Sequence, residues 1–282
     1  MPSIAACLKI ARPGNAFMAA AAAALGFYLG GSLLPAAMLA PLCIASMAAA
    51  AFGNVINDIL DLATDCISHA DRPLPRGDLT VAAARIYAAA LAIIAIAASA
   101  IISPIQLIAT LVPLCLLVLY SRFLKGAPVA GNLAVSLLVA YPLLYGALSA
   151  PGFAQLIIPA TLAFTVNFMR EVIKDLQDKT GDTAAGLRTT AVLSAKSVRA
   201  ILYSASTVYL LMLPLPFLLC HFGWIYAAIG LGVILPLHLL WIVRFPGEHT
   251  LSRLALLSRL LKIEMALGLV ALAADRFFLG NV

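Results

Sequence analysis

Six aspartates form two triplets with the same spacing. The first triplet is Asp58, Asp61 and Asp65, and 117 residues later the second is Asp175, Asp178 and Asp182. These are half of the 12 acidic residues in a chain that is 63% hydrophobic and 11% charged. On a helix, residues at i, i+3 and i+7 share one face. Carboxylates gathered near a membrane repel one another unless a cation neutralises them. The spacing therefore predicts a site for hard divalent ions, of which Mg²⁺ carrying a phosphorylated substrate is the simplest.

Polar side chains around the triplets could complete such a site. The loops beside the triplets carry basic residues that could hold phosphate oxygens directly: Arg72, Arg76, Lys174, Lys179 and Arg188. Asn57 precedes the first triplet, and its amide could ligate Mg²⁺ or bond a phosphate oxygen. Arg12 precedes the first long apolar segment and is interpreted either as an anchor at the membrane edge or as a phosphate ligand. We predict Asp58, Asp61, Asp175 and Asp178 to be the catalytic carboxylates.

The elements that must position these residues are membrane helices. The mean hydropathy is +1.05, which excludes an ordinary soluble domain. Four uncharged gaps are each long enough for two spans of about 20 residues; they lie between Arg12 and Asp58, Arg85 and Arg122, Lys125 and Arg170, and Arg199 and Arg244. These hairpins give eight helices, and 263–279 is a weaker ninth. We expect one integral membrane domain over residues 1–282, all-α, with about nine transmembrane helices around a central cavity.

The basic residues predict the orientation of these helices. If the amino terminus is cytoplasmic, 17 of the 18 lysines and arginines fall on the cytoplasmic side and only Arg276 falls outside. The net charge of +6 therefore reflects topology and is poor evidence for nucleic-acid binding. We expect a multi-pass protein of the cytoplasmic membrane, with its amino terminus, its active-site loops and the mouth of its cavity on the cytoplasmic side. No protein partner is evident.

The sequence around both triplets resembles a known family. NDILDLATD followed by DRPLPRG is similar to the first signature of the UbiA-type intramembrane prenyltransferases. REVIKDLQDKTGD followed by GLRT resembles the second aspartate motif of that family. The resemblance covers nearly the whole chain, and the two motifs together are specific. It implies Mg²⁺-dependent transfer of a prenyl group from an allylic diphosphate, with the aspartates holding the metal.

Finer features resemble one group within this family. Arg170 and Glu171 ahead of the second triplet, ARPGNAFMA and SRLLKIEMALGLVAL are similar to the archaeal digeranylgeranylglyceryl phosphate synthases. Gln177 and Lys179 depart from the pattern, because many relatives have acidic residues there. The resemblance implies transfer of a geranylgeranyl group from geranylgeranyl diphosphate to the free hydroxyl of geranylgeranylglyceryl phosphate, in ether-lipid synthesis.

Two other functions stay open on the sequence. The first is prenyl or phytyl transfer to an aromatic or tetrapyrrole acceptor, in quinone or chlorophyll synthesis. The second is an ion-coupled transporter that uses the carboxylates as cation ligands. A transporter is expected to place its carboxylates near the middle of the bilayer on broken helices, whereas both triplets here follow apolar runs and adjoin basic loops.

Overall fold

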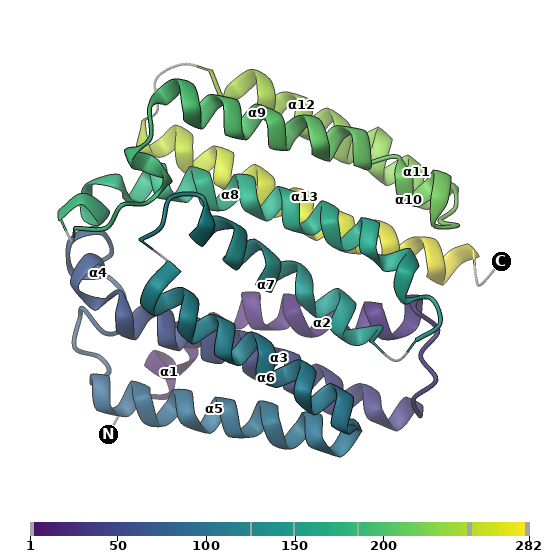
Figure 1. Cartoon of the computed structure of the whole chain (residues 1–282), viewed down its shortest axis with the longest axis horizontal. Helices are drawn as coiled ribbons and strands as arrows, with labels where there is room; N and C mark the ends of the chain where they lie inside the picture. The colour runs from purple at the N-terminus through teal and green to yellow at the C-terminus, as the bar shows by residue number, and fades with distance from the viewer. Residues whose placement is uncertain (1–2, 125, 149, 185, 247–249, 280–282) are drawn as a thin grey trace.

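The structure is a bundle of long helices that run side by side. It is a computed structural model that describes residues 3–124, 126–148, 150–184, 186–246 and 250–279. Every regular element in these ranges is helical (Figure 1). The α-helices are α1 Ile4–Ala11, α2 Pro13–Leu29, α3 Leu39–Leu60, α4 Leu62–Ser68, α5 Val81–Ile102, α6 Pro104–Leu119, α7 Ala130–Gly146, α8 Ile157–Ala184, α9 Ala195–Met212, α10 Leu215–Leu219, α11 Trp224–Ile229, α12 Leu235–Arg244 and α13 Leu251–Leu279.

Local sequence signals explain where several of these helices begin. Thr80, Ser103 and Ser194 are N-caps whose hydroxyls accept hydrogen bonds from backbone N–H groups in the first turn. Pro104 follows Ser103 at the first position of α6, where a missing N–H costs nothing. The helical hairpin predicted between Arg85 and Arg122 is therefore confirmed, because α5 ends at Ile102 and α6 begins at Pro104.

The all-helical, multi-pass prediction is confirmed in its coarse form. Six helical segments of the described chain are long and apolar enough to cross a membrane: Ala36–Leu60, Val81–Ile102, Pro104–Leu124, Phe153–Ala184, Ala195–Leu219 and Trp224–Arg244. Two shorter apolar helices, Pro13–Leu29 and Ala130–Gly146, accompany them. The 29-residue α13 covers the predicted ninth segment and extends it towards the amino-terminal side. The number nine itself is not confirmed.

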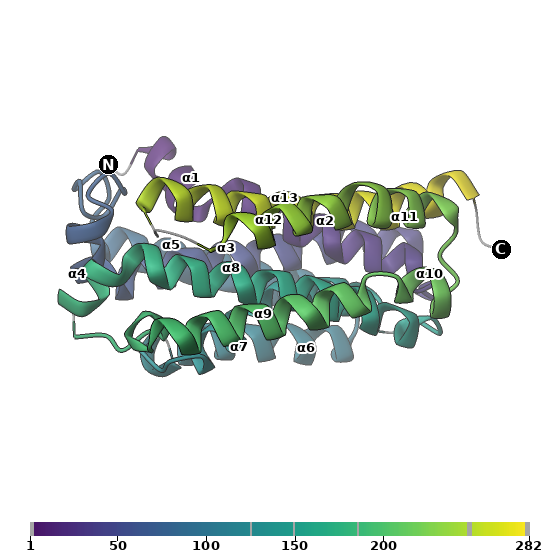
Figure 2. The ribbon, with the colours of Figure 1, turned by 90° about the horizontal axis from the view of Figure 1, so that it is seen from above.

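The helices form two groups with α2 and α7 between them. In Figure 1, α3, α5 and α6 lie on one side of α7, and α8, α9, α12 and α13 lie on the other. Figure 2 shows that the long helices run roughly along one axis, with α1 and α4 at one end and the carboxyl terminus at the other. Helices α3 and α8, which carry the acidic residues, both run towards the end marked by α4.

Two glycines allow α2 and α7 to touch through their backbones. A Cβ atom on Gly26 would lie 2.0 Å from the carbonyl oxygen of Leu143, and one on Gly146 would lie 1.9 Å from that of Ala23. No larger side chain fits at either position without moving the helices apart. Small residues of this kind are how membrane helices approach closely, because packing takes the place of the hydrophobic effect between them.

A series of buried, hydrogen-bonded polar side chains links the carboxyl-terminal helices. His238 of α12 and Glu264 of α13 are fully buried, and the Nδ1 of His238 lies 2.9 Å from the Oε2 of Glu264. The Nε2 of the same ring lies 2.8 Å from the hydroxyl of Ser206 in α9. The three side chains therefore link three helices inside an apolar core.

Removing the carboxylate should destabilise this half of the bundle. Glu264→Ala leaves His238 buried without its partner, and breaking a buried charged or polar pair costs about 3–5 kcal/mol. We expect a lower midpoint of thermal unfolding in detergent, whereas Glu264→Gln, which keeps an oxygen for the ring nitrogen, should lose much less. An alanine variant as stable as the parent chain would contradict this role.

Candidate active site

The two acidic triplets are built differently. Asp175, Asp178 and Asp182 lie within the single helix α8, which continues to Ala184. The first triplet is divided, because α3 ends at Leu60 and α4 begins at Leu62, with Asp61 in the turn between them. The expectation that each triplet lies on one face of one helix is therefore confirmed for the second and wrong for the first. Asp58 and Asp65 stay close enough across this turn for Arg72 to contact both.

Two arginines pair with two members of the first triplet. The guanidinium of Arg12 donates to the Oδ1 of Asp58. The Nη1 of Arg72 donates to both carboxylate oxygens of Asp65 at 2.6 Å and lies 3.6 Å from Asp58. Burial by itself lowers the pKa of Arg72, but the hydrogen bond and charge of Asp65, with Asp58 and Asp178 nearby, outweigh it and raise the pKa. The side chains of Asp58 and Asp65 are each 4% exposed, so these cations compensate buried charge.

Hydrogen bonds from two other elements orient Asp175. Its Oδ2 accepts from the side-chain amide of Asn132 in α7 and from the backbone N–H of Thr190, each at 3.0 Å. The hydroxyl of Thr190 donates in turn to the Oδ1 of Asn132. The backbone N–H of Val129 donates to the same hydroxyl at 3.0 Å. The Oδ2 oxygen of Asp175 is thus fixed by donors, which prepares the carboxylate to bind in one direction.

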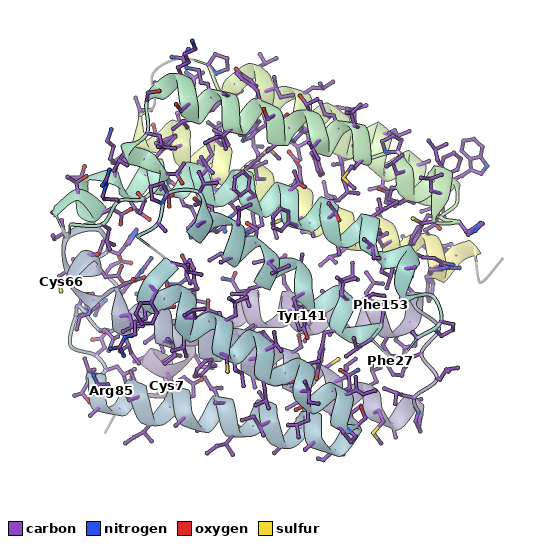
Figure 3. The ribbon with its side chains drawn as sticks, in the orientation of Figure 1. Cys7, Phe27, Cys66, Arg85, Tyr141 and Phe153 are labelled. Atoms are coloured by element: carbon purple, nitrogen blue, oxygen red, sulfur yellow. The ribbon has the colours of Figure 1, made fainter. Side chains whose placement is uncertain are left out.

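The two triplets meet at one end of the bundle. The Nε2 of His69, at the end of α4, lies 3.1 Å from the Oδ1 of Asp178, and α4 packs against α8. Figure 3 shows Cys66 of α4 and Arg85 of α5 at this same end. Asp61 and Asp182 are also buried there. The two halves of the chain therefore bring their carboxylates to one region, as the equal spacing predicts.

A cavity of about 700 Å³ runs from this region into the bundle. Arg12, Asn57, Arg72 and Lys174 line it at the acidic end, and apolar side chains of α2, α3, α6, α7, α8 and α13 line most of the remainder. None of the six aspartates is among the described lining residues, whereas both arginines that pair with the first triplet are. The cavity therefore presents a cationic mouth backed by carboxylates and an apolar interior.

The carboxylate and amide oxygens near the cavity mouth are chemically suited to bind a hard divalent cation. Across the described residues, no three histidine, cysteine, aspartate or glutamate side chains are gathered closely enough to hold a metal by themselves. The arginines occupy carboxylate oxygens of Asp58 and Asp65 in this conformation. The Oδ1 of Asn57, the residue before Asp58, is buried and has no hydrogen-bond partner. An unpartnered amide oxygen beside carboxylates is a donor set that Mg²⁺ prefers.

The other predicted phosphate ligands lie elsewhere. Lys174 lines the cavity and donates to Glu171 at 3.0 Å. Arg76 pairs with Asp78 at 3.2 Å on the surface of the loop. Lys179 and Arg188 are exposed and do not line the cavity. The structure thus brings Arg12, Arg72, Asn57 and Lys174 together at the mouth and leaves the other three outside it.

Several residues beside the carboxylates were not predicted to belong to the site. Thr190 carried no signal other than its place after the GLRT segment. Asn132 of α7 donates to Asp175. His69 is half-buried and contacts Asp178. Arg170 lines the cavity and was noted in the sequence without a role.

These features define an integral membrane protein with a cationic mouth on a largely apolar cavity. A family model described as the UbiA prenyltransferase family matches residues 16–261. The chain belongs to the UbiA prenyltransferase family, as its paired motifs predict, and it is accordingly an enzyme of the prenyltransferase class.

Curated relatives match nearly the full length of the chain. The digeranylgeranylglyceryl phosphate synthase of Methanopyrus kandleri is 34% identical over 272 residues, which are 96% of this chain and 98% of that protein. The synthase of the same name from Korarchaeum cryptofilum is 33% identical over 287 residues, covering 98% and 99%.

Solved structures share the fold. A structure described for digeranylgeranylglyceryl phosphate synthase in membranes has a TM-score of 0.77 and 24% identity, covering 98% of this chain and 99% of that one. A UbiA homologue from Archaeoglobus fulgidus bound to GPP and Mg²⁺ has a TM-score of 0.71 and 19% identity, covering 95% and 99%. At these identities the likeness establishes the fold.

Proposed function

We propose that this protein transfers the geranylgeranyl group of geranylgeranyl diphosphate to the free hydroxyl of geranylgeranylglyceryl phosphate, in ether-lipid synthesis. The observation that carries the proposal is the full-length similarity to curated synthases of that name. The site supports it, because a mouth lined by Arg12, Arg72 and Lys174 suits a diphosphate and the apolar interior suits an isoprenoid tail.

The carboxylates and Asn57 would hold Mg²⁺. We assign metal binding to the two triplets, Asp58, Asp61, Asp65, Asp175, Asp178 and Asp182, and to the unpartnered oxygen of Asn57. Bound Mg²⁺ neutralises negative charge that develops on a departing diphosphate. Asn132 and Thr190 support this by holding Asp175 in one orientation. The number of metal ions is left open.

Arg12 and Arg72 bind phosphate oxygens in this proposal. Both already donate to carboxylates at the cavity mouth, so binding of a metal to those carboxylates would release guanidinium donors to the diphosphate. Charge stabilisation at the leaving group lets the bond from C1 to oxygen stretch or break. The oxygen of the acceptor hydroxyl forms a bond to C1, and the bond from C1 to the diphosphate oxygen breaks. The hydroxyl proton passes to a nearby base, and diphosphate leaves as the second product. The apolar helices exclude water, which would otherwise capture the allylic cation.

The end that carries the acidic site faces the cytoplasm in this proposal. The basic residues around the two motifs support that orientation through the positive-inside rule. The protein would then be a multi-pass protein of the cytoplasmic membrane whose cavity opens towards soluble diphosphates. We expect a membrane-impermeant thiol reagent to label Cys66, which is exposed on α4, in inverted vesicles but not in right-side-out vesicles.

A transfer assay tests the function. The purified protein in liposomes receives labelled geranylgeranyl diphosphate and Mg²⁺ with one acceptor at a time: geranylgeranylglyceryl phosphate, 4-hydroxybenzoate or chlorophyllide. We expect product with the glyceryl phosphate alone. Product with one of the others would retain prenyl transfer and overturn the acceptor. Absence of transfer to all three, with donor binding intact, would overturn the ether-lipid assignment.

A further inference from the structure

The cavity divides around the contact between α2 and α7. Gly26 and Gly146 bring these helices into backbone contact, so no lipid tail can pass between the helices at this point. Lining residues nevertheless occur on both sides of this contact. On one side lies Thr110 of α6, whose hydroxyl donates to that of Tyr145 in α7 at 3.0 Å. On the other side lie Leu213, which directly follows α9, and Leu272 of α13. The half of the cavity that lies far from the acidic end therefore has two arms.

Each arm has its own cations. On the side of α3 the lining cations are Arg12 and Arg72, which pair with the first acidic triplet. On the side of α8 and α13, which pack against each other, the lining cations include Arg170 and Lys262. Neither of these two belongs to the assigned diphosphate site.

Arg170 has donor capacity that the protein does not use. Its Nη1 donates to the Oε1 of Glu171 at 2.8 Å, but its Nε is buried and has no hydrogen-bond partner. Glu171 also accepts from Lys174 at 3.0 Å, so one carboxylate serves two cations. Lys174 belongs to the diphosphate mouth, so the cations that remain on this side are Arg170, with its unused Nε, and Lys262, which lines the cavity and is exposed. A half-buried guanidinium in a cavity wall, with a buried Nε that has no acceptor, is suited to bind an anion.

We infer that Arg170 and Lys262 form a separate subsite for the phosphate of the acceptor, whose own tail lies in the arm between α8, α9, α11 and α13. This inference rests on the proposed function, because it gives a phosphorylated lipid acceptor its place. The donor tail takes the arm beside α3 and α6. Two lipid substrates with separate phosphates and separate arms can bind together without exchanging positions, which sets the direction of transfer.

Charge variants test the phosphate subsite. Arg170→Gln and Lys262→Gln should each raise the KM for geranylgeranylglyceryl phosphate by about tenfold or more, as expected for losing one charged hydrogen bond. The KM for geranylgeranyl diphosphate should change less than twofold. Arg259→Gln, an exposed residue of the same helix α13 that does not line the cavity, is the matched control. Geranylgeranylglycerol, which lacks the phosphate, should be a poor acceptor whose use is unaffected by either substitution.

Bulky variants test the two arms independently. Gly268 of α13 lines the cavity, and a Cβ atom there meets nothing within 4 Å, so Gly268→Phe can enter the cavity without a backbone clash. We expect it to weaken equilibrium binding of geranylgeranylglyceryl phosphate while binding of the donor with Mg²⁺ is retained, which also shows that the variant is folded. Ala50→Phe, from the α3 wall, should do the reverse.

The outcomes separate this inference from the proposed function. Transfer to geranylgeranylglyceryl phosphate by the parent chain, with unchanged acceptor KM in both charge variants, would overturn the subsite alone. Equal loss of both substrates in Gly268→Phe and Ala50→Phe would overturn the two arms. Absence of transfer to this acceptor by the parent chain would overturn the function and the subsite with it.

Discussion

Replacing Asp58 or Asp175 by asparagine is expected to lower kcat by about three orders of magnitude, the range found when charge stabilisation of a transition state is removed. Each residue comes from a different triplet, so each substitution weakens one half of the proposed metal site. Asparagine keeps the size of the side chain and its ability to hydrogen-bond, and this limits the effect on folding. The measurement is single-turnover transfer from labelled geranylgeranyl diphosphate at saturating Mg²⁺.

The two variants should differ in their side effects. Asp58 is paired with Arg12, so Asp58→Asn also frees a guanidinium at the cavity mouth and should leave donor binding partly intact. Asp175 accepts from Asn132 and from the N–H of Thr190. Its replacement therefore also loosens α7 from the segment after α8.

Matched controls come from the surface loop after the first triplet. Asp71 lies near Lys9 at 3.9 Å and is exposed, and Asp78 pairs with Arg76 outside the cavity. Asp71→Asn and Asp78→Asn remove the same charge at the same end of the bundle. They should retain more than half of the parent rate. Equal losses in all four variants would mean that the overall negative charge matters and the triplets do not.

The sequence predicted the parts of the site that depend on spacing. Each triplet follows a long apolar run, which predicts its place at the end of a membrane helix, and the triplets lie at the carboxyl-terminal ends of α3 and α8. The uncharged gap between Arg85 and Arg122 predicted the hairpin of α5 and α6. These features are local, so a linear sequence contains them in full.

The parts that the sequence did not predict depend on tertiary contacts. The bond from Thr190 to Asn132 joins residues 58 positions apart, and neither side chain stands out by type or spacing. The same holds for His238 and Glu264, which the chain brings together inside an apolar core. The turn at Asp61 was missed because every residue around it is compatible with a helix. The π-helical turn Tyr120–Leu124 has no local signal that we recognise.

Removal of divalent metal should abolish both turnover and tight donor binding. Without Mg²⁺, the buried carboxylates of Asp58 and Asp65 repel the phosphates of the donor. Arg12 and Arg72 then remain paired with these two aspartates. A chelator should therefore reduce transfer to background, and added Mg²⁺ should restore it. The readouts are the transfer rate and the binding of labelled geranylgeranyl diphosphate, each measured against Mg²⁺ concentration.

Asn57 provides the sharpest form of this experiment. Its unpartnered Oδ1 is a proposed ligand, so Asn57→Ala should raise the Mg²⁺ concentration for half-maximal activity by about tenfold. Asn57→Asp, which restores an oxygen at the same place, should require less Mg²⁺ than the alanine variant. If both variants show the parent's Mg²⁺ dependence, Asn57 does not ligate the metal. A parent chain that retains full activity after chelation would contradict the metal-dependent mechanism itself, because the described cations Arg12, Arg72 and Lys174 already pair with carboxylates and do not also offset the charge of a diphosphate.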